Sequence, residues 1–267
     1  MKPAASGSAP ARVTQDGPVS TAPAAPPAGT DGAARRAVVV DDEQPLARLV
    51  AGYLERDGYA TTVCHHGAEA VEVLREVDPD VVVLDLGLPG LDGVEVCRRL
   101  RTFSDCYVVM LTARAEEVDT LIGLSVGADD YMTKPFSPRE LMARVAALMR
   151  RPRRAPTVGA AAVPAAQLLE VGDLRIDVDA RDVHLGDRAV PLTRTEFDVL
   201  ATLAGRPGRV FSRRALIDAV WGPGWVGDEH LVDVHVLHVR QKLGDTVDAQ
   251  RYVRTVRGVG YRIGTGA

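Results

Sequence analysis

The chain lacks several features that define common classes of protein. It has no run of 18 or more apolar residues, so the sequence predicts no membrane-spanning helix. Residues 1–36 are rich in Ala, Pro, Gly, Ser and Thr, without apolar periodicity or the continuous apolar core of a secretory signal, and we expect a disordered tail. The 3 cysteines form no Cys-x-x-Cys pair, which favours buried thiols in a reducing cytoplasm over disulfides.

An overall excess of positive charge is also missing. The formal net charge is −4, and residues 37–150 hold 20 acidic against 11 basic residues. Residues 168–267 hold 14 of each, so this part is not the strongly basic module typical of many DNA-binding domains. A length of 267 residues fits two domains with connecting segments.

A carboxylate stands at the end of one strongly apolar segment. Residues 81–84 read Val-Val-Val-Leu, a pattern that predicts a fully buried strand, and Asp85 follows directly. The Gly and Pro residues at 87–93 predict a loop after it. Because ligands bind at the carboxyl ends of strands in open α/β sheets, Asp85 is a candidate site residue. The alternative is that Asp85 only caps the next helix.

Three further segments end in matching polar groups. The apolar run 37–40 precedes Asp41 and Asp42, the run 107–111 precedes Thr112, and Lys134 follows a short segment at 131–133. If these strands are parallel neighbours, the groups meet at one edge of the sheet. Clustered carboxylates need a cation, and oxygen ligands without His or Cys suit Mg²⁺. A Mg²⁺ and a Lys beside a carboxylate can hold a phosphoryl group for attack by that carboxylate.

These residues resemble the receiver domain of two-component response regulators, over residues 37 to about 150. The resemblance rests on the Asp41-Asp42 pair, Leu88-Pro89 and Asp92-Gly93 after Asp85, Thr112-Ala113 and Lys134-Pro135-Phe136. It implies that Asp85 accepts a phosphoryl group and that Asp42, Asp85 and the Gly87 carbonyl hold Mg²⁺, with Asp41 acting through water. It further implies that Lys134 pairs with the phosphoryl group and that Thr112 and Tyr131 form a switch. A phosphatase of the haloacid dehalogenase type would need an Asp where Gly87 stands.

Amphipathic segments lie between these strands. Apolar residues recur with a 3.6-residue period at 46–54, 70–77, 91–100, 121–124 and 141–149, with Leu46, Leu49 and Val50 on one predicted core face. Five alternations of strand and helix predict a five-stranded, doubly wound parallel α/β sheet. By resemblance, the last two helices pair two receivers after phosphorylation, and the implied interface residues are Asp129, Asp130, Arg144 and Arg151.

The C-terminal part has a different pattern. A proline-containing segment at 152–167 predicts a flexible linker. Alternating apolar residues at 174–178 and 183–185 then predict short antiparallel strands, and Thr193 and Glu196 have capping-box spacing at a helix start. Two more helices, beginning after Ser212 and at about residue 229, and a hairpin at 252–263 follow. This order predicts a winged helix-turn-helix of the α+β class.

The segments 232–236 and 254–262 resemble the effector domain of the OmpR/PhoB subfamily. The resemblance implies that the third helix enters the major groove of DNA, that Arg257 in the wing reaches the minor groove, and that Thr255 and Tyr261 contact phosphates. The helix departs from the family, which commonly has basic residues at the positions of His230, Leu237 and His238. Two of these are His here and one is Leu, while Val234 could meet a thymine methyl. The candidate DNA contacts are His230, Val234, Leu237, His238, Arg240, Thr255, Arg257 and Tyr261.

Two functions of different classes remain open. The first is a cytoplasmic, phosphorylation-controlled transcription regulator, not an enzyme, with a histidine kinase, double-stranded DNA, RNA polymerase and a second copy of itself as partners. The second is a receiver-controlled protein-interaction module whose winged helix has lost specific DNA binding. The predicted organisation is a tail at 1–36, a receiver at 37–151, a linker at 152–167 and a DNA-binding domain at 168–267.

Overall fold

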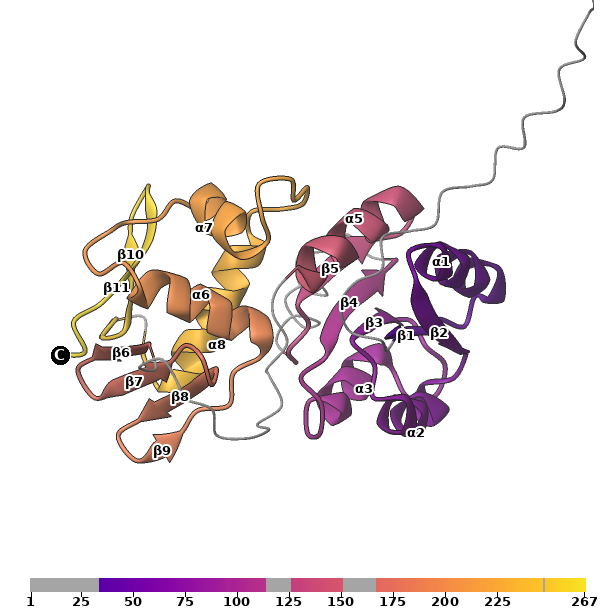
Figure 1. Ribbon diagram of the computed structural model, residues 1–267, viewed down its shortest axis with the longest axis horizontal. Helices are drawn as coiled ribbons and strands as arrows, with labels where there is room; N and C mark the ends of the chain where they lie inside the picture. Colours follow the sequence, from indigo (N-terminus) through magenta and orange to yellow (C-terminus); the bar gives the residue numbers. More distant parts are fainter. Residues whose placement is uncertain (1–33, 114–125, 151–166, 247) are drawn as a thin grey trace, which may run out of the picture. The chain divides into compact units, whose positions relative to one another are not determined.

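The computed structural model describes residues 34–113, 126–150, 167–246 and 248–267 (Figure 1). The N-terminal domain, predicted to be a receiver, is a five-stranded sheet in the order β2-β1-β3-β4-β5, in which every neighbouring pair is parallel. The predicted doubly wound α/β fold is therefore confirmed. Its described elements are β1 (Arg35–Val40), α1 (Gln44–Arg56), β2 (Tyr59–Cys64), α2 (Gly67–Val77), β3 (Val81–Asp85), α3 (Gly93–Leu100), β4 (Tyr107–Thr112), β5 (Asp130–Thr133) and α5 (Pro138–Met149).

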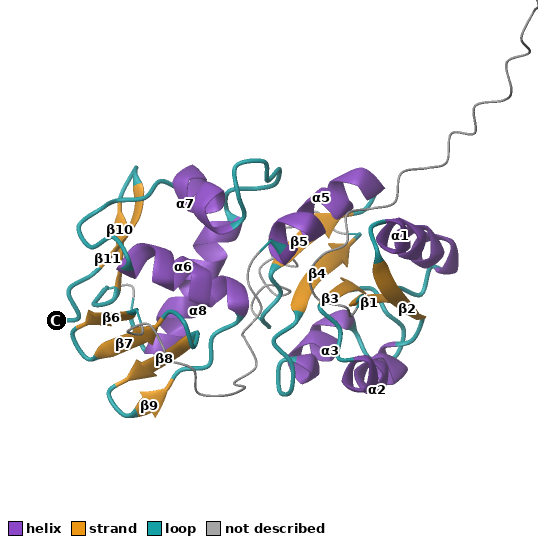
Figure 2. Ribbon diagram, viewed as in Figure 1, coloured by secondary structure: helices purple, strands orange, loops and turns teal. Residues whose placement is uncertain are grey.

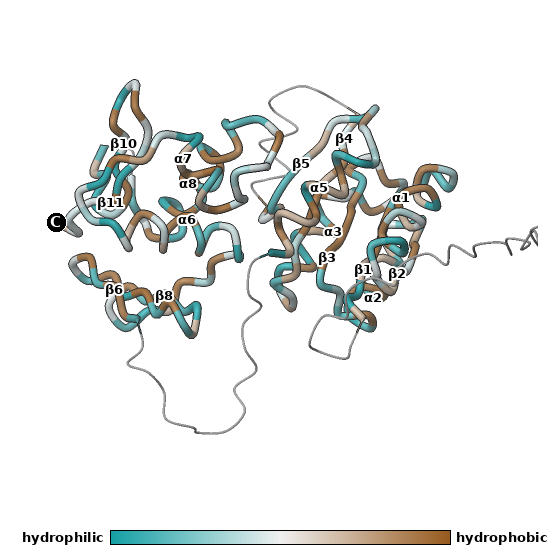
Figure 3. Tube along the Cα trace, turned by 45° about the horizontal axis from the view of Figure 1, so that its top comes forward, coloured by the Kyte–Doolittle hydropathy of each residue, from teal (hydrophilic) through white to brown (hydrophobic). Residues whose placement is uncertain are grey.

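Continuous apolar runs form the central strands because both faces of the sheet carry helices. All residues of β3 and β4 are buried, as the runs of Val and Leu predict. The hydrophobic stretches of β1 and β3 are visible in Figure 3. Helix α1 contacts α5, and α2 contacts α3, so the helices form two layers around the strands (Figure 2).

The structure differs from the sequence-based expectations at one face of α1 and at the start of β1. The prediction that Leu49 lies in the core is wrong, since its side chain is 47% exposed while Val50 is buried. The apolar stripe of α1 is wider than the part of the helix that the sheet covers. Strand β1 begins at Arg35, which pairs with Tyr59, two residues before the predicted start of the domain. The predicted helix at 121–124 lies outside the described residues.

The described residues of the C-terminal domain form an antiparallel sheet, three helices and a hairpin. The sheet has the order β6-β7-β8-β9, and the hairpin of β10 and β11 is antiparallel. The predicted winged helix-turn-helix is therefore confirmed. Its elements are β6 (Leu168–Val171), β7 (Leu174–Asp177), β8 (Asp182–Leu185), β9 (Arg188–Ala189), α6 (Arg194–Ala204), α7 (Arg213–Val220), α8 (Leu231–Leu243), β10 (Val253–Val256) and β11 (Gly260–Ile263).

Local sequence signals set the ends of these helices. Thr193 and Glu196 form the predicted capping box at the start of α6, and the Ser212 side chain accepts a hydrogen bond from the Ala215 amide at the start of α7. Helix α8 ends at Gly244, which has φ of 68°. Among the described residues, no helix combines the length and apolar character needed to cross a membrane.

Candidate functional site

The ends of four receiver strands meet at one edge of the sheet. Val40, which precedes Asp41, is aligned with Leu84, which precedes Asp85. Asp85 is aligned with Leu111 of β4, and Thr112 with Thr133 of β5, directly before Lys134. Strand order changes direction between β1 and β3, so Asp41 and Asp85 flank the position where open α/β sheets bind ligands.

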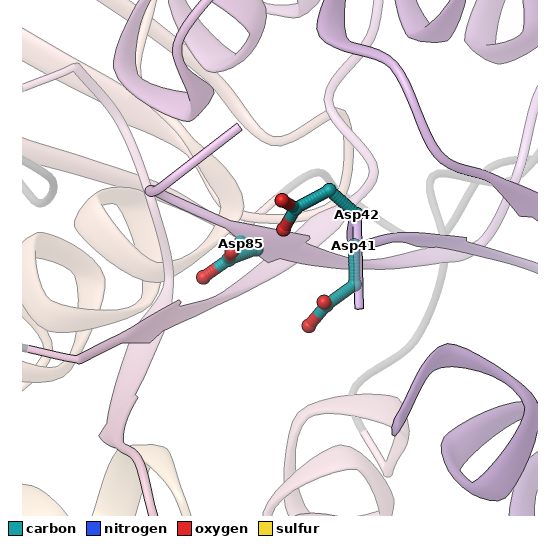
Figure 4. Close-up of side chains that lie close together, drawn as sticks. All are labelled: Asp41, Asp42 and Asp85. Atoms are coloured by element: carbon teal, nitrogen blue, oxygen red, sulfur yellow. The ribbon is translucent and has the colours of Figure 1, made fainter. Parts of the chain in front are cut away.

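Three carboxylates gather at this edge (Figure 4). Asp41, Asp42 and Asp85 each offer an oxygen, and these oxygens all lie within 4.8 Å of one another. Asp41 and Asp85 are buried, with 0% and 5% of their surface exposed, whereas Asp42 is exposed. The cluster is therefore built into the sheet at two positions and open to solvent at the third.

Lys134 joins the two buried carboxylates. Its Nζ lies 2.8 Å from Asp41 Oδ2 and 3.2 Å from Asp85 Oδ1. Burial raises the pKa of Asp85 above its ordinary value, with Asp41 adding to the effect and Lys134 opposing it. Burial alone disfavours the ammonium of Lys134, but its bonds to Asp41 and Asp85 outweigh this and raise its pKa. The site therefore keeps one cation among carboxylates that would otherwise repel each other.

Asp85 does not cap the following helix. The cap of α3 is Asp92, whose side chain accepts a hydrogen bond from the Glu95 amide at 2.7 Å. Gly93 brings the start of α3 close to the strand end, because a Cβ at this position would lie 2.1 Å from the Asp85 carbonyl oxygen. The structure thus removes the capping alternative, and the Asp85 carboxylate instead has an oxygen within 4.8 Å of those of the other two acids.

The chemistry of this donor set fits Mg²⁺. The cluster consists of carboxylate oxygens, which are the hard ligands that Mg²⁺ prefers, and among the described residues it contains neither imidazole nor thiolate. The exposed position of Asp42 leaves one side open to water, which Mg²⁺ retains in protein sites.

The two predicted switch residues lie on neighbouring strands. Thr112 ends β4 and is buried, and its carbonyl oxygen accepts a hydrogen bond from the Lys134 amide at 2.7 Å. Tyr131 on β5 is half-buried. Burial raises the pKa of Tyr131 to about 12. Its phenol is therefore harder to ionise than that of a free tyrosine.

The predicted dimer residues make ion pairs within the receiver. Asp130 pairs with Arg144 at 2.9 Å, and both are buried. Asp129 pairs with Arg101 at 2.8 Å, and it also accepts a hydrogen bond from the Val108 amide at 2.9 Å. Arg151 lies outside the described residues. Pairing between two copies stays a prediction, and in this structure Asp129, Asp130 and Arg144 already have partners of opposite charge within the receiver.

The predicted DNA contacts on α8 divide into exposed and buried side chains. His230 is exposed, and Leu237 is 39% exposed. Val234 and His238 are buried, with 6% and 4% exposure, and His238 Nδ1 lies 3.6 Å from Glu196 Oε1 of α6. Val234 and His238 could therefore contact DNA only if their buried side chains on α8 became exposed.

Arg240 has a position that the sequence did not indicate. Its side chain is only 7% exposed and donates to the Val253 carbonyl oxygen from Nε at 3.1 Å and from Nη2 at 2.9 Å. Nη2 also donates to Thr255 Oγ1 at 2.7 Å. Arg240 thus ties α8 to the first strand of the wing instead of facing solvent. The wing itself presents Thr255 and Arg257 as exposed side chains.

Sequence reasoning missed a network centred on Asp233. Its Oδ1 accepts from Arg213 Nε at 2.7 Å and from the Tyr261 hydroxyl at 2.6 Å, and its Oδ2 lies 3.1 Å from His230 Nδ1. Tyr261 is only 6% exposed. The His230–Asp233 spacing was readable in the sequence, but no local pattern connects Arg213 with Asp233 or Tyr261. The network links α7, α8 and the wing at the surface predicted to meet DNA.

Comparison with known proteins agrees with both halves of this architecture. Residues 37–146 match the family described as the response regulator receiver domain. Residues 187–263 match the family described as transcriptional regulatory protein, C terminal. A receiver fold with an acidic cluster, joined to a winged helix, defines a DNA-binding response regulator.

Relatives of known function share this architecture over nearly their whole length. DNA-binding response regulator MtrA of Mycolicibacterium smegmatis is 44% identical over 230 residues, covering 86% of this chain and 97% of the relative. The alkaline phosphatase synthesis transcriptional regulatory protein PhoP of Bacillus subtilis is 41% identical over 238 residues, covering 86% and 96%. A solved structure of a RitR mutant has a TM-score of 0.67 at 27% identity, covering 87% and 100%. The chain belongs to the OmpR/PhoB subfamily of response regulators.

Proposed function

We propose that Asp85 accepts a phosphoryl group from a histidine kinase. The observation that carries this assignment is the convergence of Asp41, Asp42 and Asp85 with Lys134, which lies 3.2 Å from Asp85. In the proposed step an Asp85 oxygen attacks phosphorus, the bond from phosphorus to the donor imidazole breaks, and an acyl phosphate forms on the protein. The donor nitrogen keeps the electron pair of the broken bond.

Each neighbouring group has a separate part in this proposal. Asp42, Asp85 and the Gly87 carbonyl would hold Mg²⁺, with Asp41 acting through water. The bound ion would neutralise charge on the phosphoryl oxygens. Lys134, which now bonds the two carboxylates, would pair with the incoming phosphoryl group. The protein modifies its own carboxylate and turns over no external substrate in this proposal, so we assign it no enzyme activity.

The test is labelling by acetyl phosphate in the presence of Mg²⁺. We expect Asp85→Asn to abolish labelling. The control is Asp92→Asn, because Asp92 lies in the same loop and Asn also caps helices well. The control should label as the wild type does. Full and stable labelling of the Asp85→Asn protein at another residue would refute the assignment.

The proposed output is control of transcription through DNA binding by the winged helix. The exposed positions of His230, Leu237 and Arg257 favour contact through α8 and the wing. Phosphorylation would act through Thr112 and Tyr131 and bring two copies together. We further propose that the loop 222–228 contacts RNA polymerase and that the protein works in the cytoplasm. Val226 in this loop is 60% exposed, which leaves an apolar side chain available to a partner.

The second candidate is a receiver-controlled protein-interaction module without specific DNA binding. The apolar Leu237 on the recognition helix is the observation that favours it. Titration of the phosphorylated protein against a directly repeated DNA site at several salt concentrations distinguishes the two functions. Strong salt dependence, together with tighter binding to the directly repeated site than to an unrelated duplex, supports the regulator. Binding that does not exceed that of an unrelated duplex supports the interaction module.

A further inference from the structure

The segment Cys64–Gly67, here called the histidine loop, lies against the backbone of the first metal-site acid. It connects β2 with α2. The Asp41 amide donates to the Cys64 carbonyl oxygen at 3.1 Å, and His65 Nδ1 lies 2.8 Å from the Asp41 carbonyl oxygen. Both backbone polar groups of Asp41 are therefore bound by two consecutive residues of this loop.

The bond from His65 restrains the backbone that leads into Asp42. The Asp41 carbonyl belongs to the planar peptide group that joins Asp41 to Asp42, so fixing this oxygen also fixes the direction in which the chain enters Asp42. The side chain of Asp41 is held separately, because Oδ1 accepts from the Glu43 amide at 2.9 Å and Oδ2 from Lys134 at 2.8 Å. Asp42 is exposed, in contrast to the buried Asp41. The bonded peptide group is therefore a restraint on the backbone from which the Asp42 side chain extends.

The other end of the histidine loop lies against the loop after Asp85. A Cβ on Gly67 would stand 1.8 Å from the Leu91 carbonyl oxygen, so only glycine permits this approach. The histidine loop therefore touches both loops that supply the proposed metal ligands. The loop thus adds a contact to two segments whose strands, β1 and β3, are already paired in the sheet.

We infer that His65 is a positioning residue for the metal site. This inference rests on the proposed function. To bind a carbonyl oxygen, its Nδ1 must carry the proton, so His65 acts as a donor and not as a ligand through this atom. Groups that orient metal ligands in this way commonly change metal affinity by on the order of tenfold or more when they are removed. The neighbouring His66 is exposed and its side chain makes no capping bond with α2. It provides a matched control.

The experiment compares four variants of the full chain with the wild type. Mg²⁺ affinity is measured by calorimetry on the unphosphorylated protein, and the rate of labelling by acetyl phosphate is measured at saturating Mg²⁺. We expect His65→Leu to raise the Mg²⁺ Kd on the order of tenfold. The labelling rate at saturating Mg²⁺ should stay within about twofold of the wild-type rate. The arrangement of the ligands in the metal-free site affects ion binding more than it affects phosphoryl transfer once the ion is bound. His66→Leu should match the wild type in both measurements.

Rescue separates positioning from simple packing. His65→Asn places an amide donor near the position of Nδ1 and should recover most of the affinity, whereas His65→Gln moves the donor outward and should not. This comparison also serves if His65→Leu fails to fold. A wild-type Kd in His65→Leu, or equal losses in the Asn and Gln variants, would overturn the inference while leaving the proposed function intact. A wild type that binds no Mg²⁺ would overturn both.

Discussion

Leu237 gives the most direct test of how α8 meets DNA. Its side chain is 39% exposed, while Val236 and Val239 beside it are buried. Replacement by Arg therefore removes little buried apolar surface, and we expect Leu237→Arg to change the free energy of unfolding by less than about 0.5 kcal/mol. The same change adds a positive charge to the helix proposed to enter the major groove.

The size of the effect follows from counterion release. Each new phosphate contact steepens the slope of log affinity against log salt by about 0.9. Over a fourfold rise in salt, the Leu237→Arg protein should lose about 3.5 times more affinity than the wild type does, starting from tighter binding at low salt. If the new Arg reaches guanine instead, discrimination at one base pair should change by about 1–3 kcal/mol.

The assay is a titration of the phosphorylated, full-length protein with duplex DNA at several salt concentrations. Arg257→Ala provides the opposite change, because Arg257 is exposed in the wing, and it should weaken binding and flatten the slope. Arg240→Ala serves as a structural control. It removes donors from the buried Val253 carbonyl and should cost about 1–3 kcal/mol of stability. An unchanged slope together with unchanged base-pair discrimination in a folded Leu237→Arg protein would refute the proposed orientation of α8, and an unfolded protein would place Leu237 in the core.

Three further predictions concern the receiver. Burial raises the pKa of Asp85, so the folded state binds this proton more tightly than the unfolded state, and stability falls as pH rises through the ordinary and then the raised pKa. Asp85→Asn should therefore melt above the wild type at neutral pH without Mg²⁺, and the gap should close in acid; a constant gap would contradict this. Lys134→Ala should still bind Mg²⁺ but lose phosphorylation-induced dimerisation, so an unchanged dimer fraction in sedimentation would count against its role. Charge reversal at Asp130 should weaken the phosphorylated dimer, and reversal of Arg144 as well should partly restore it. Because the two residues pair within the chain at 2.9 Å, recovery of monomer melting without recovery of dimerisation would assign the pair to the fold alone.

Much of the receiver was readable in the sequence because its signals are local. A run such as Val81–Leu84 is typical of a strand buried on both faces, as in a parallel sheet covered by helices, and the polar residue that ends such a run then lies at the carboxyl end of the strand. The caps of α6 and α7 were likewise predictable, since Thr193 and Ser212 bind amides three residues away. In each case the physical cause acts within a few residues of the chain.

Tertiary structure decided what depends on contacts between distant segments. Arg240 looked like a DNA contact by charge and position, yet its guanidinium is bound to the carbonyl of Val253, 13 residues away. His65 belongs to no motif in the sequence analysis, and its bond to Asp41 joins positions separated by 24 residues. Leu49 is the opposite case, a residue predicted to be buried that is exposed. Periodicity identified the apolar stripe of α1, but only the packing of the helix determined how much of that stripe is covered.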